Sequence, residues 1–87
     1  MTMFQKIPAR ALTDSVAEQL LEKIEDGMFP RGAKLPTEAV LSEEFGVSRT
    51  VIREAIARLK YEGLVESRQG SGVFVTEQAG IRPLRID

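Results

Sequence analysis

Two short helix-like segments on either side of a glycine constrain this chain more than any other feature. They lie between Thr37 and Gly63, in the sequence TEAVLSEEFGVSRTVIREAIARLKYEG, with Gly46 between them. Thr37 and Ser48 stand where the two segments begin, and hydroxyl side chains are preferred at the N-cap of a helix. Apolar residues recur at helical spacing in both segments, so this stretch predicts a helix-turn-helix.

The flanking sequence predicts one more helix before this unit and a β-hairpin after it. We expect helices over about 14–26, 37–45 and 49–62, and strands over 64–67 and 73–76. Thr13 is the expected N-cap of the first helix, and residues 68–72 are the expected hairpin tip. The predicted fold class is therefore mostly α with a small β-hairpin: a winged helix-turn-helix of three helices and a two-stranded wing.

The same pattern divides the chain into one domain and two ends. Residues 12–76 form the predicted winged helix-turn-helix domain. Residues 1–11 lack periodicity and are expected to be a flexible N-terminal arm, whereas residues 77–87 are polar with no pattern of their own. A domain of this size buries only about 60% of the surface that its unfolded chain exposes, so the predicted core is modest.

Missing residue types exclude several classes of function. The chain has no cysteine and no histidine, which excludes zinc fingers, disulfide scaffolds and catalysis by either residue. It also lacks a nucleophile–base pair and a phosphate-binding glycine loop that opens a helix, so we expect neither an enzyme nor a bound cofactor or metal. There is no secretory signal and no apolar run of about 20 residues, which favours a cytoplasmic protein outside the membrane.

The charges are unevenly distributed along the chain. The net charge is −1, which is unusual for a protein that binds nucleic acid. Residues 13–45 contain eight acidic and three basic residues, whereas residues 46–72 contain five basic and three acidic residues. The basic excess therefore falls on the last predicted helix and the hairpin, and the acidic remainder argues against tight non-specific binding.

One face of the predicted helix over 49–62 carries the candidate DNA-reading residues. At 100° per residue, Arg49, Thr50 and Arg53 cluster opposite an apolar face. A recognition helix contacts base edges with its N-terminal residues, and the arginine fork matches guanine O6 and N7. Thr50 can contact a phosphate or a thymine methyl group. Lys60 shares this face but lies about 16 Å farther along the axis, so we expect it outside the groove.

The helix caps and the hairpin tip supply further candidate contacts to DNA. Ser48 and Thr37 stand at helix N-termini, where free backbone N–H groups favour a phosphate. Glycine at the tip lets the backbone approach a phosphate or the minor-groove wall closely. The candidate residues of the tip are Arg68, Gln69, Gly70, Ser71 and Gly72.

Each of these features has a simpler interpretation when it is taken alone. Exposed arginines are most often solvated, a glycine-rich tip is most often only a turn, and Thr37 and Ser48 are ordinary caps. Their order and spacing together favour a DNA-binding domain. The alternative is a winged helix used as a protein-interaction module without DNA binding, which an apolar residue at position 49 or 53 would favour.

Four sequence blocks resemble the GntR family of bacterial transcription regulators. In chain order they are LPTE at 35–38, FGVSRTVIREA at 45–55, EGLV at 62–65 and GSGVFV at 70–75. The resemblance covers about residues 12–76, and the RTVIREA block is most similar to the FadR-type subfamily.

The resemblance implies a metabolite-responsive regulator that binds a double-stranded DNA operator as a homodimer. Two identical modules related by a two-fold axis read an inverted repeat. It also implies a C-terminal domain that binds a small-molecule effector, so residues 77–87 are expected to be a linker toward a domain that these 87 residues do not include. Family DNA contacts fall on Ser48, Arg49, Thr50, Arg53, Gln69 and Gly70.

Ala39 departs from the family pattern. Family members commonly carry an arginine after the glutamate of the LPxE motif, and this arginine reads DNA. The chain has alanine at that position. The resemblance therefore implies that a base contact is missing, so that the operator differs from the family norm or the affinity is lower.

Overall fold

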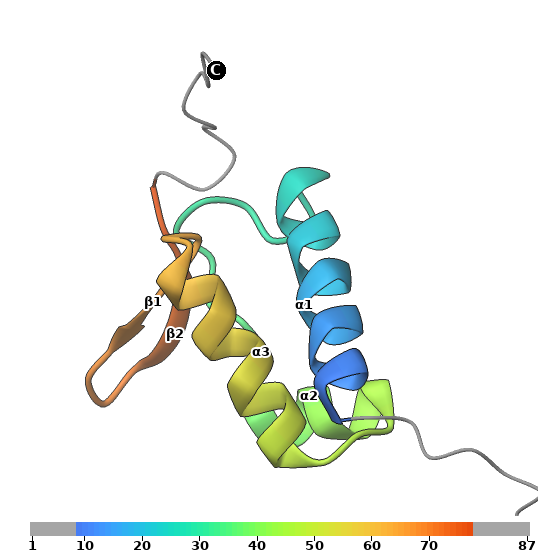
Figure 1. Ribbon diagram of the computed structural model, residues 1–87. Helices are drawn as coiled ribbons and strands as arrows, with labels where there is room; N and C mark the ends of the chain where they lie inside the picture. Colours follow the sequence, from blue (N-terminus) through green and yellow to red (C-terminus); the bar gives the residue numbers. More distant parts are fainter. Residues whose placement is uncertain (1–8, 78–87) are drawn as a thin grey trace, which may run out of the picture.

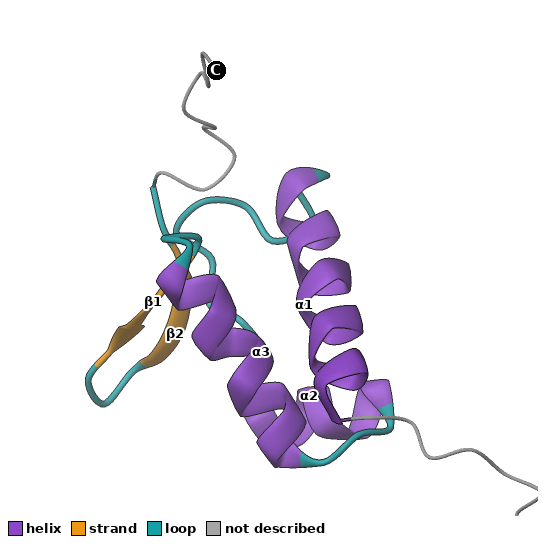
Figure 2. Ribbon diagram, viewed as in Figure 1, coloured by secondary structure: helices purple, strands orange, loops and turns teal. Residues whose placement is uncertain are grey.

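A computed structural model describes residues 9–77 as three helices and a hairpin (Figures 1 and 2). The elements are α1 (Ala9–Glu25), α2 (Glu38–Phe45), α3 (Arg49–Tyr61), β1 (Val65–Arg68) and β2 (Gly72–Val75). The two strands form one antiparallel sheet. The predicted fold class, a winged helix-turn-helix, is thus confirmed. Helix α3 is central, because it contacts α1, α2 and β1.

The core lies between the inner face of α3 and the helix and strands around it. The α3 residues that the wheel places on the apolar face are all buried: Ile52, Ala55, Ile56 and Leu59. They pack with one stripe of α1 and with buried residues of the remaining elements, namely Val16, Ala17, Leu20, Ile24, Leu35, Leu41, Val65 and Val75. Burial of one face of α3 leaves the opposite face free to contact a partner.

Side-chain caps fix where α2 and α3 begin. The Oγ1 atom of Thr37 accepts a hydrogen bond from the Val40 backbone N–H, and the Oγ atom of Ser48 accepts one from the Val51 N–H, each at 3.2 Å. Gly46 ends α2 in the left-handed region at φ 68°. A residue with a Cβ is strained in this conformation, so glycine makes the tight turn between the two helices possible.

Helix α1 begins earlier than the sequence pattern predicts. It starts at Ala9, so Thr13 lies inside the helix and is not its N-cap. Instead, the Thr13 hydroxyl is buried and donates to Oε1 of Glu54 at 3.2 Å. Alanine and leucine favour a helix, and Leu12 packs against the core, which extends α1 toward the N-terminus. Residues 9–11 of the expected arm are therefore helical, and 1–8 and 78–87 lie outside the described residues.

The hairpin tip is shorter than predicted. Arg68 and Gly72 are not tip residues, because they pair with each other at the ends of the two strands. Only residues 69–71 form the loop, which the Ser71 backbone N–H closes by donating to the Arg68 carbonyl at 2.9 Å. This turn bond shifts each predicted strand by one residue, to 65–68 and 72–75.

The connector between α1 and α2, residues 26–37, pairs with the hairpin, which the sequence pattern did not predict. Lys34 forms an antiparallel bridge with Phe74. The Leu35 N–H donates to the Val73 carbonyl, and the Val75 N–H donates to the Ala33 carbonyl, both at 2.8 Å. The connector thereby covers the edge of β2 that β1 leaves free. Prolines and glycine on both sides of this short segment give it the sequence pattern of a turn.

Candidate nucleic-acid interface

The outward face of α3 presents the arginines that the sequence singled out. Arg49, Thr50 and Arg53 are exposed, and they stand in the first turns of the helix behind the Ser48 cap. Ala57 and Lys60 continue this face and are also exposed. The helix therefore presents two guanidinium groups at its N-terminal end, where an inserted recognition helix reaches base edges.

Arg53 has a partner in the first turn of α2. Its Nη2 atom donates to Oε1 of Glu38 at 3.3 Å, and 65% of the Arg53 side chain is exposed. An exposed ion pair contributes at most about 1 kcal/mol, whereas a bidentate guanine contact contributes about 1–3 kcal/mol. Glu38 therefore orients the Arg53 side chain, and this ion pair is weak enough for a guanine contact to replace it. The contact also places the start of α2 beside the outward face of α3.

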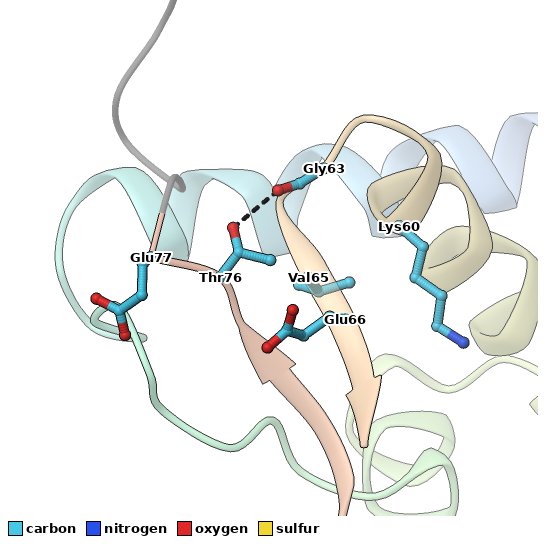
Figure 3. A pocket seen from close by; sticks show the side chains of 6 residues that line it. All are labelled: Lys60, Gly63, Val65, Glu66, Thr76 and Glu77. Carbon is cyan, nitrogen blue, oxygen red and sulfur yellow. Dashed lines mark hydrogen bonds between the residues drawn. The ribbon is translucent and has the colours of Figure 1, made fainter. Parts of the chain in front are cut away.

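The remaining basic residues of α3, Arg58 and Lys60, lie away from its N-terminal turns. Arg58 donates from Nη1 to Oδ1 of Asp14 at 2.8 Å and lies 3.6 Å from Oε2 of Glu62, so it joins α3 to α1. Lys60 lines a pocket between the end of α3 and the hairpin (Figure 3). Glu77 also lines this pocket, and an acidic carboxylate repels a phosphate. Arg58 and Lys60 are therefore poorly placed to contact DNA.

The two capping hydroxyls keep a donor for a partner. Thr37 and Ser48 are exposed, and each uses its oxygen as the acceptor of a backbone N–H. A hydroxyl group that accepts in this way still has its own O–H to donate. Each cap can thus donate to a phosphate while it holds the helix terminus in place.

The wing tip is exposed and tightly turned. Gln69, Gly70 and Ser71 are all exposed, and Gly70 has a φ of 77°. This positive φ requires glycine, because a Cβ is strained there. The tip therefore offers an amide, a hydroxyl and bare backbone to a groove wall.

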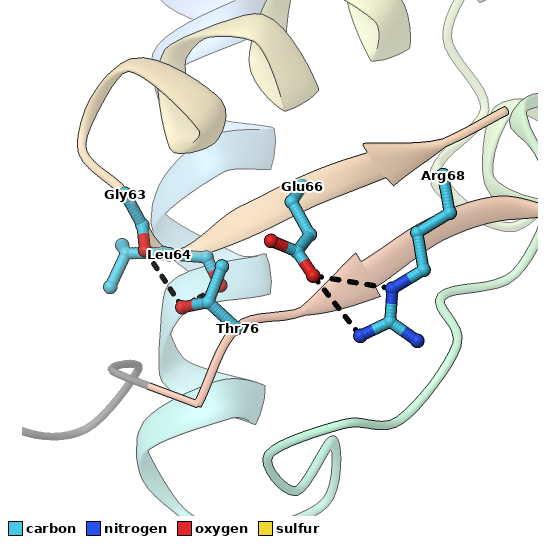
Figure 4. A network of polar contacts seen from close by, with 5 residues as sticks. All are labelled: Gly63, Leu64, Glu66, Arg68 and Thr76. Carbon is cyan, nitrogen blue, oxygen red and sulfur yellow. Dashed lines mark hydrogen bonds and ion pairs between the residues drawn. The ribbon is translucent and has the colours of Figure 1, made fainter.

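Arg68 lies on the strand behind the tip and is held there by two neighbours. Its Nε and Nη2 atoms donate to Oε2 of Glu66 at 3.2 and 3.0 Å (Figure 4). Its guanidinium carbon lies 4.3 Å from the centroid of the Phe74 ring, in a cation–π contact. Among the predicted tip residues, all of which the structure describes, Arg68 is thus the one whose side chain has partners inside the protein.

A basic residue that sequence reasoning missed reaches the wing from the connector. A Cβ added to Gly72 would lie 2.8 Å from Cε of Lys34, so the Lys34 side chain passes over this glycine. Gly72 is favoured by its φ of 120°, which strains any residue with a Cβ, whereas the flexible end of the Lys34 side chain could shift away from an added Cβ. The only sequence signal was a single lysine before the LPTE block, which does not indicate the contact.

Among residues 9–77, no cluster of three or more acidic, histidine or cysteine side chains could hold a metal ion. No helix in the same range is both long enough and apolar enough to cross a membrane.

The family pattern for bacterial regulatory proteins of the gntR family matches residues 12–75. This chain belongs to the GntR family. The four blocks that carry the resemblance lie at the α2 cap, at the start of α3, at the turn from α3 into β1 and in the wing. The family consists of regulatory proteins, so its match confirms the prediction that this chain is not an enzyme.

Curated relatives match this GntR-family domain over a fraction of their own length. The Exu regulon transcriptional regulator of Escherichia coli (strain K12) is 50% identical over 66 residues, 76% of this chain and 26% of that protein. The Uxu operon regulator of Haemophilus influenzae is 50% identical over 60 residues, 69% of this chain and 23% of that protein. The chain thus spans about a quarter of the length of these two relatives, which are consistent with the FadR-type subfamily.

Solved structures of DNA-binding domains superpose on this GntR-family domain. The AraR DNA-binding domain in complex with operator ORX1 has a TM-score of 0.73 and 36% identity, over 87% of this chain and 90% of that chain. The same domain with operator ORE1 has a TM-score of 0.73 and 37% identity, over 85% of this chain and 95% of that chain. The match therefore covers nearly the whole of each AraR chain.

Ala39 is exposed, so an arginine can be introduced there to test whether the missing family contact matters for DNA binding. Ala39 lies in the first turn of α2 and is exposed, as is Val40, whereas Leu41 is the buried residue of this helix. We predict that Ala39→Arg tightens DNA binding by about 1–3 kcal/mol if the added fork reaches a guanine. The slope of log K against log salt should steepen by about 0.9 if it reaches a phosphate.

A binding titration at several salt concentrations measures this change, and a thermal melt of the same protein is its control. The melt should be nearly unchanged, since arginine is a good helix former at an exposed site. Unchanged affinity in a variant that melts like the parent would show that α2 does not approach the DNA.

Proposed function

We propose that this domain binds double-stranded DNA in a sequence-specific manner, as the operator-binding part of a bacterial metabolite-responsive regulator. One observation carries the proposal: Arg49, Thr50 and Arg53 stand exposed together at the capped end of α3, opposite its buried face. The superposition on AraR DNA-binding domains solved with operator DNA supports it.

The contacts have distinct roles in this proposal. Arg49 and Arg53 enter the major groove and read guanine, and Thr50 contacts a phosphate or a thymine methyl group. Thr37 and Ser48 donate to backbone phosphates and set the depth of insertion. The wing tip lies at the groove edge, where Gln69 donates its side-chain amide and Gly70 allows close backbone approach.

A protein-interaction module without DNA binding is the less well supported alternative. An apolar residue at position 49 or 53 of the outward face of α3 would favour such a module, but both positions hold arginine. The exposed large hydrophobic residues of the described chain are Met28, Val40 and Tyr61, which belong to three different segments.

The proposal also includes an assembly. We infer that the regulator acts as a homodimer in the cytoplasm, that two copies of this domain read one operator, and that a small molecule binds a separate C-terminal domain. Its support is the family, whose matched relatives are about four times as long as the matched region. No cofactor is needed for the contacts described above.

Selection of bound duplexes from a random pool tests the function, and we predict that the recovered sites are short inverted repeats. A two-fold axis relates the two domains, so their half-sites must be identical and opposed. A longer, dimeric form should bind such a site about 10² to 10⁴ times more tightly than one isolated domain, through effective concentration. Recovered sequences without dyad symmetry would contradict the assembly, and a pool with no enrichment would contradict DNA binding.

A further inference from the structure

The strand register sorts the hairpin residues onto two faces. Directly paired residues of antiparallel strands lie on the same face, and successive residues alternate. The pair Val65 and Val75 is buried against the core. The pairs Glu66–Phe74 and Arg68–Gly72 therefore lie on the opposite, outer face of the hairpin. The outer face thus carries one carboxylate, one guanidinium, one aromatic ring and a bare glycine.

Lys34 joins this outer face from the connector. Its bridge to Phe74 puts its side chain on the same face as that ring. From there the side chain runs toward the tip, because a Cβ on Gly72 would meet Cε of Lys34 at 2.8 Å and Nζ at 3.7 Å. The ammonium group therefore lies beside the first residue after the loop of 69–71.

The charge on Lys34 is not neutralised by an acid within the described chain. The ion pairs among residues 9–77 use Arg53, Arg58 and Arg68, and Glu66, the acidic residue of the outer face, is bonded to Arg68. Lys34 is exposed and takes part in none of them. A solvated cation next to a glycine-rich tip attracts an anion that approaches the tip.

We propose that Lys34 binds a phosphate of the DNA backbone beside the wing. This inference rests on the proposed function and adds a contact that comes from neither the recognition helix nor the hairpin. A lysine ammonium is a point charge on a flexible stem, which suits a phosphate oxygen rather than the fixed edge of a base. Lys34 therefore contributes affinity and salt dependence, while the choice of sequence stays with Arg49 and Arg53.

The simpler alternative is that Lys34 only packs its methylene stem over Gly72. Lys34→Met separates the two roles, because methionine keeps an unbranched stem and removes the charge. Lys23→Met is the matched control: Lys23 is also an exposed lysine outside the ion pairs of the described chain, but it lies in the last turn of α1. Both variants change the net charge by the same amount.

Titrations of the 87-residue chain against a selected duplex, between 50 and 200 mM salt, test the phosphate contact. Lys34→Met should bind more weakly at low salt, with a slope of log K against log salt that is shallower by about 0.9. Its affinity deficit should therefore shrink about three- to fourfold across this range. Lys34→Arg should keep the parental slope. The parent, Lys34→Met and Lys34→Arg should rank the selected sites in the same order.

The outcomes distinguish this inference from the function on which it rests. The phosphate contact is overturned if Lys34→Met keeps the parental slope of log K against log salt, or if Lys23→Met loses as much slope as Lys34→Met. Specific DNA binding by the domain stands in either case. A parent that prefers no selected duplex overturns both. A thermal melt of Lys34→Met should match the parent, and a lowered melt with a parental slope assigns Lys34 to packing alone and overturns the contact.

Discussion

Arg49→Ala is expected to weaken binding to the selected operator by about 1–3 kcal/mol, or roughly 5- to 150-fold. Arg49 is the first residue of α3 and is exposed, so its truncation removes a bidentate contact without opening the core. Preference should relax at one base pair of each half-site, because the other contacts remain. Titration against the operator and against single-base variants measures the loss of affinity and the change of preference together.

Arg53→Ala should have an effect of similar size at a different base pair. Its exposed contact with Glu38 is worth too little to change the fold, so the melt should move by only a few degrees. Lys60→Ala is the matched control, since Lys60 lies on the same helix in the pocket beside the hairpin. Parental affinity in both arginine variants, or an equal loss in Lys60→Ala, would refute the assignment of the reading face.

Ile52→Ala is expected to destabilise the domain by about 2–5 kcal/mol. The Ile52 side chain is 0% exposed and lies in the core between α3 and the elements around it. In a domain this small the loss removes much of the total free energy of unfolding, and the melting midpoint should fall by at least about 10 °C. Thermal melts followed by circular dichroism measure it, with Val40→Ala as the control.

Val40 is 43% exposed on α2, so its truncation opens no cavity and should change stability by no more than about 0.5 kcal/mol. A small shift in Ile52→Ala would show that the core relaxes around the deletion. DNA binding by Ile52→Ala should recover on cooling, since its outward face is unchanged. One helix thus serves both stability and recognition, and the two kinds of variant separate these roles.

Local chemistry explains why the helix-turn-helix was predictable. Thr37 and Ser48 act as caps in the structure as their residue types predict, and Gly46 occupies the left-handed position between the helices. The apolar stripe of α3 is buried as its spacing predicts. Caps, turns and helical spacing involve residues at most a few positions apart, so the order of residues is enough to find them.

Contacts between distant residues were not predictable in the same way. Thr13 has the residue type of a cap, yet its hydroxyl bonds to Glu54, which is 41 residues away. Arg68 was expected at the tip, but it is held on β1 by Glu66 and Phe74. In both cases a side chain that is typical of one local role found a partner that only the packed fold supplies.

The sequence by itself determined the fold class, the caps, the buried face of α3 and hence the outward position of Arg49 and Arg53, because each depends on periodicity and on the preferences of single residues. The tertiary structure alone decided the rest. It joined Glu38 to Arg53 across two helices, paired the connector with β2, and laid Lys34 over Gly72. These contacts link residues that are at least 15 positions apart, and chain order does not specify which distant groups meet until the elements pack.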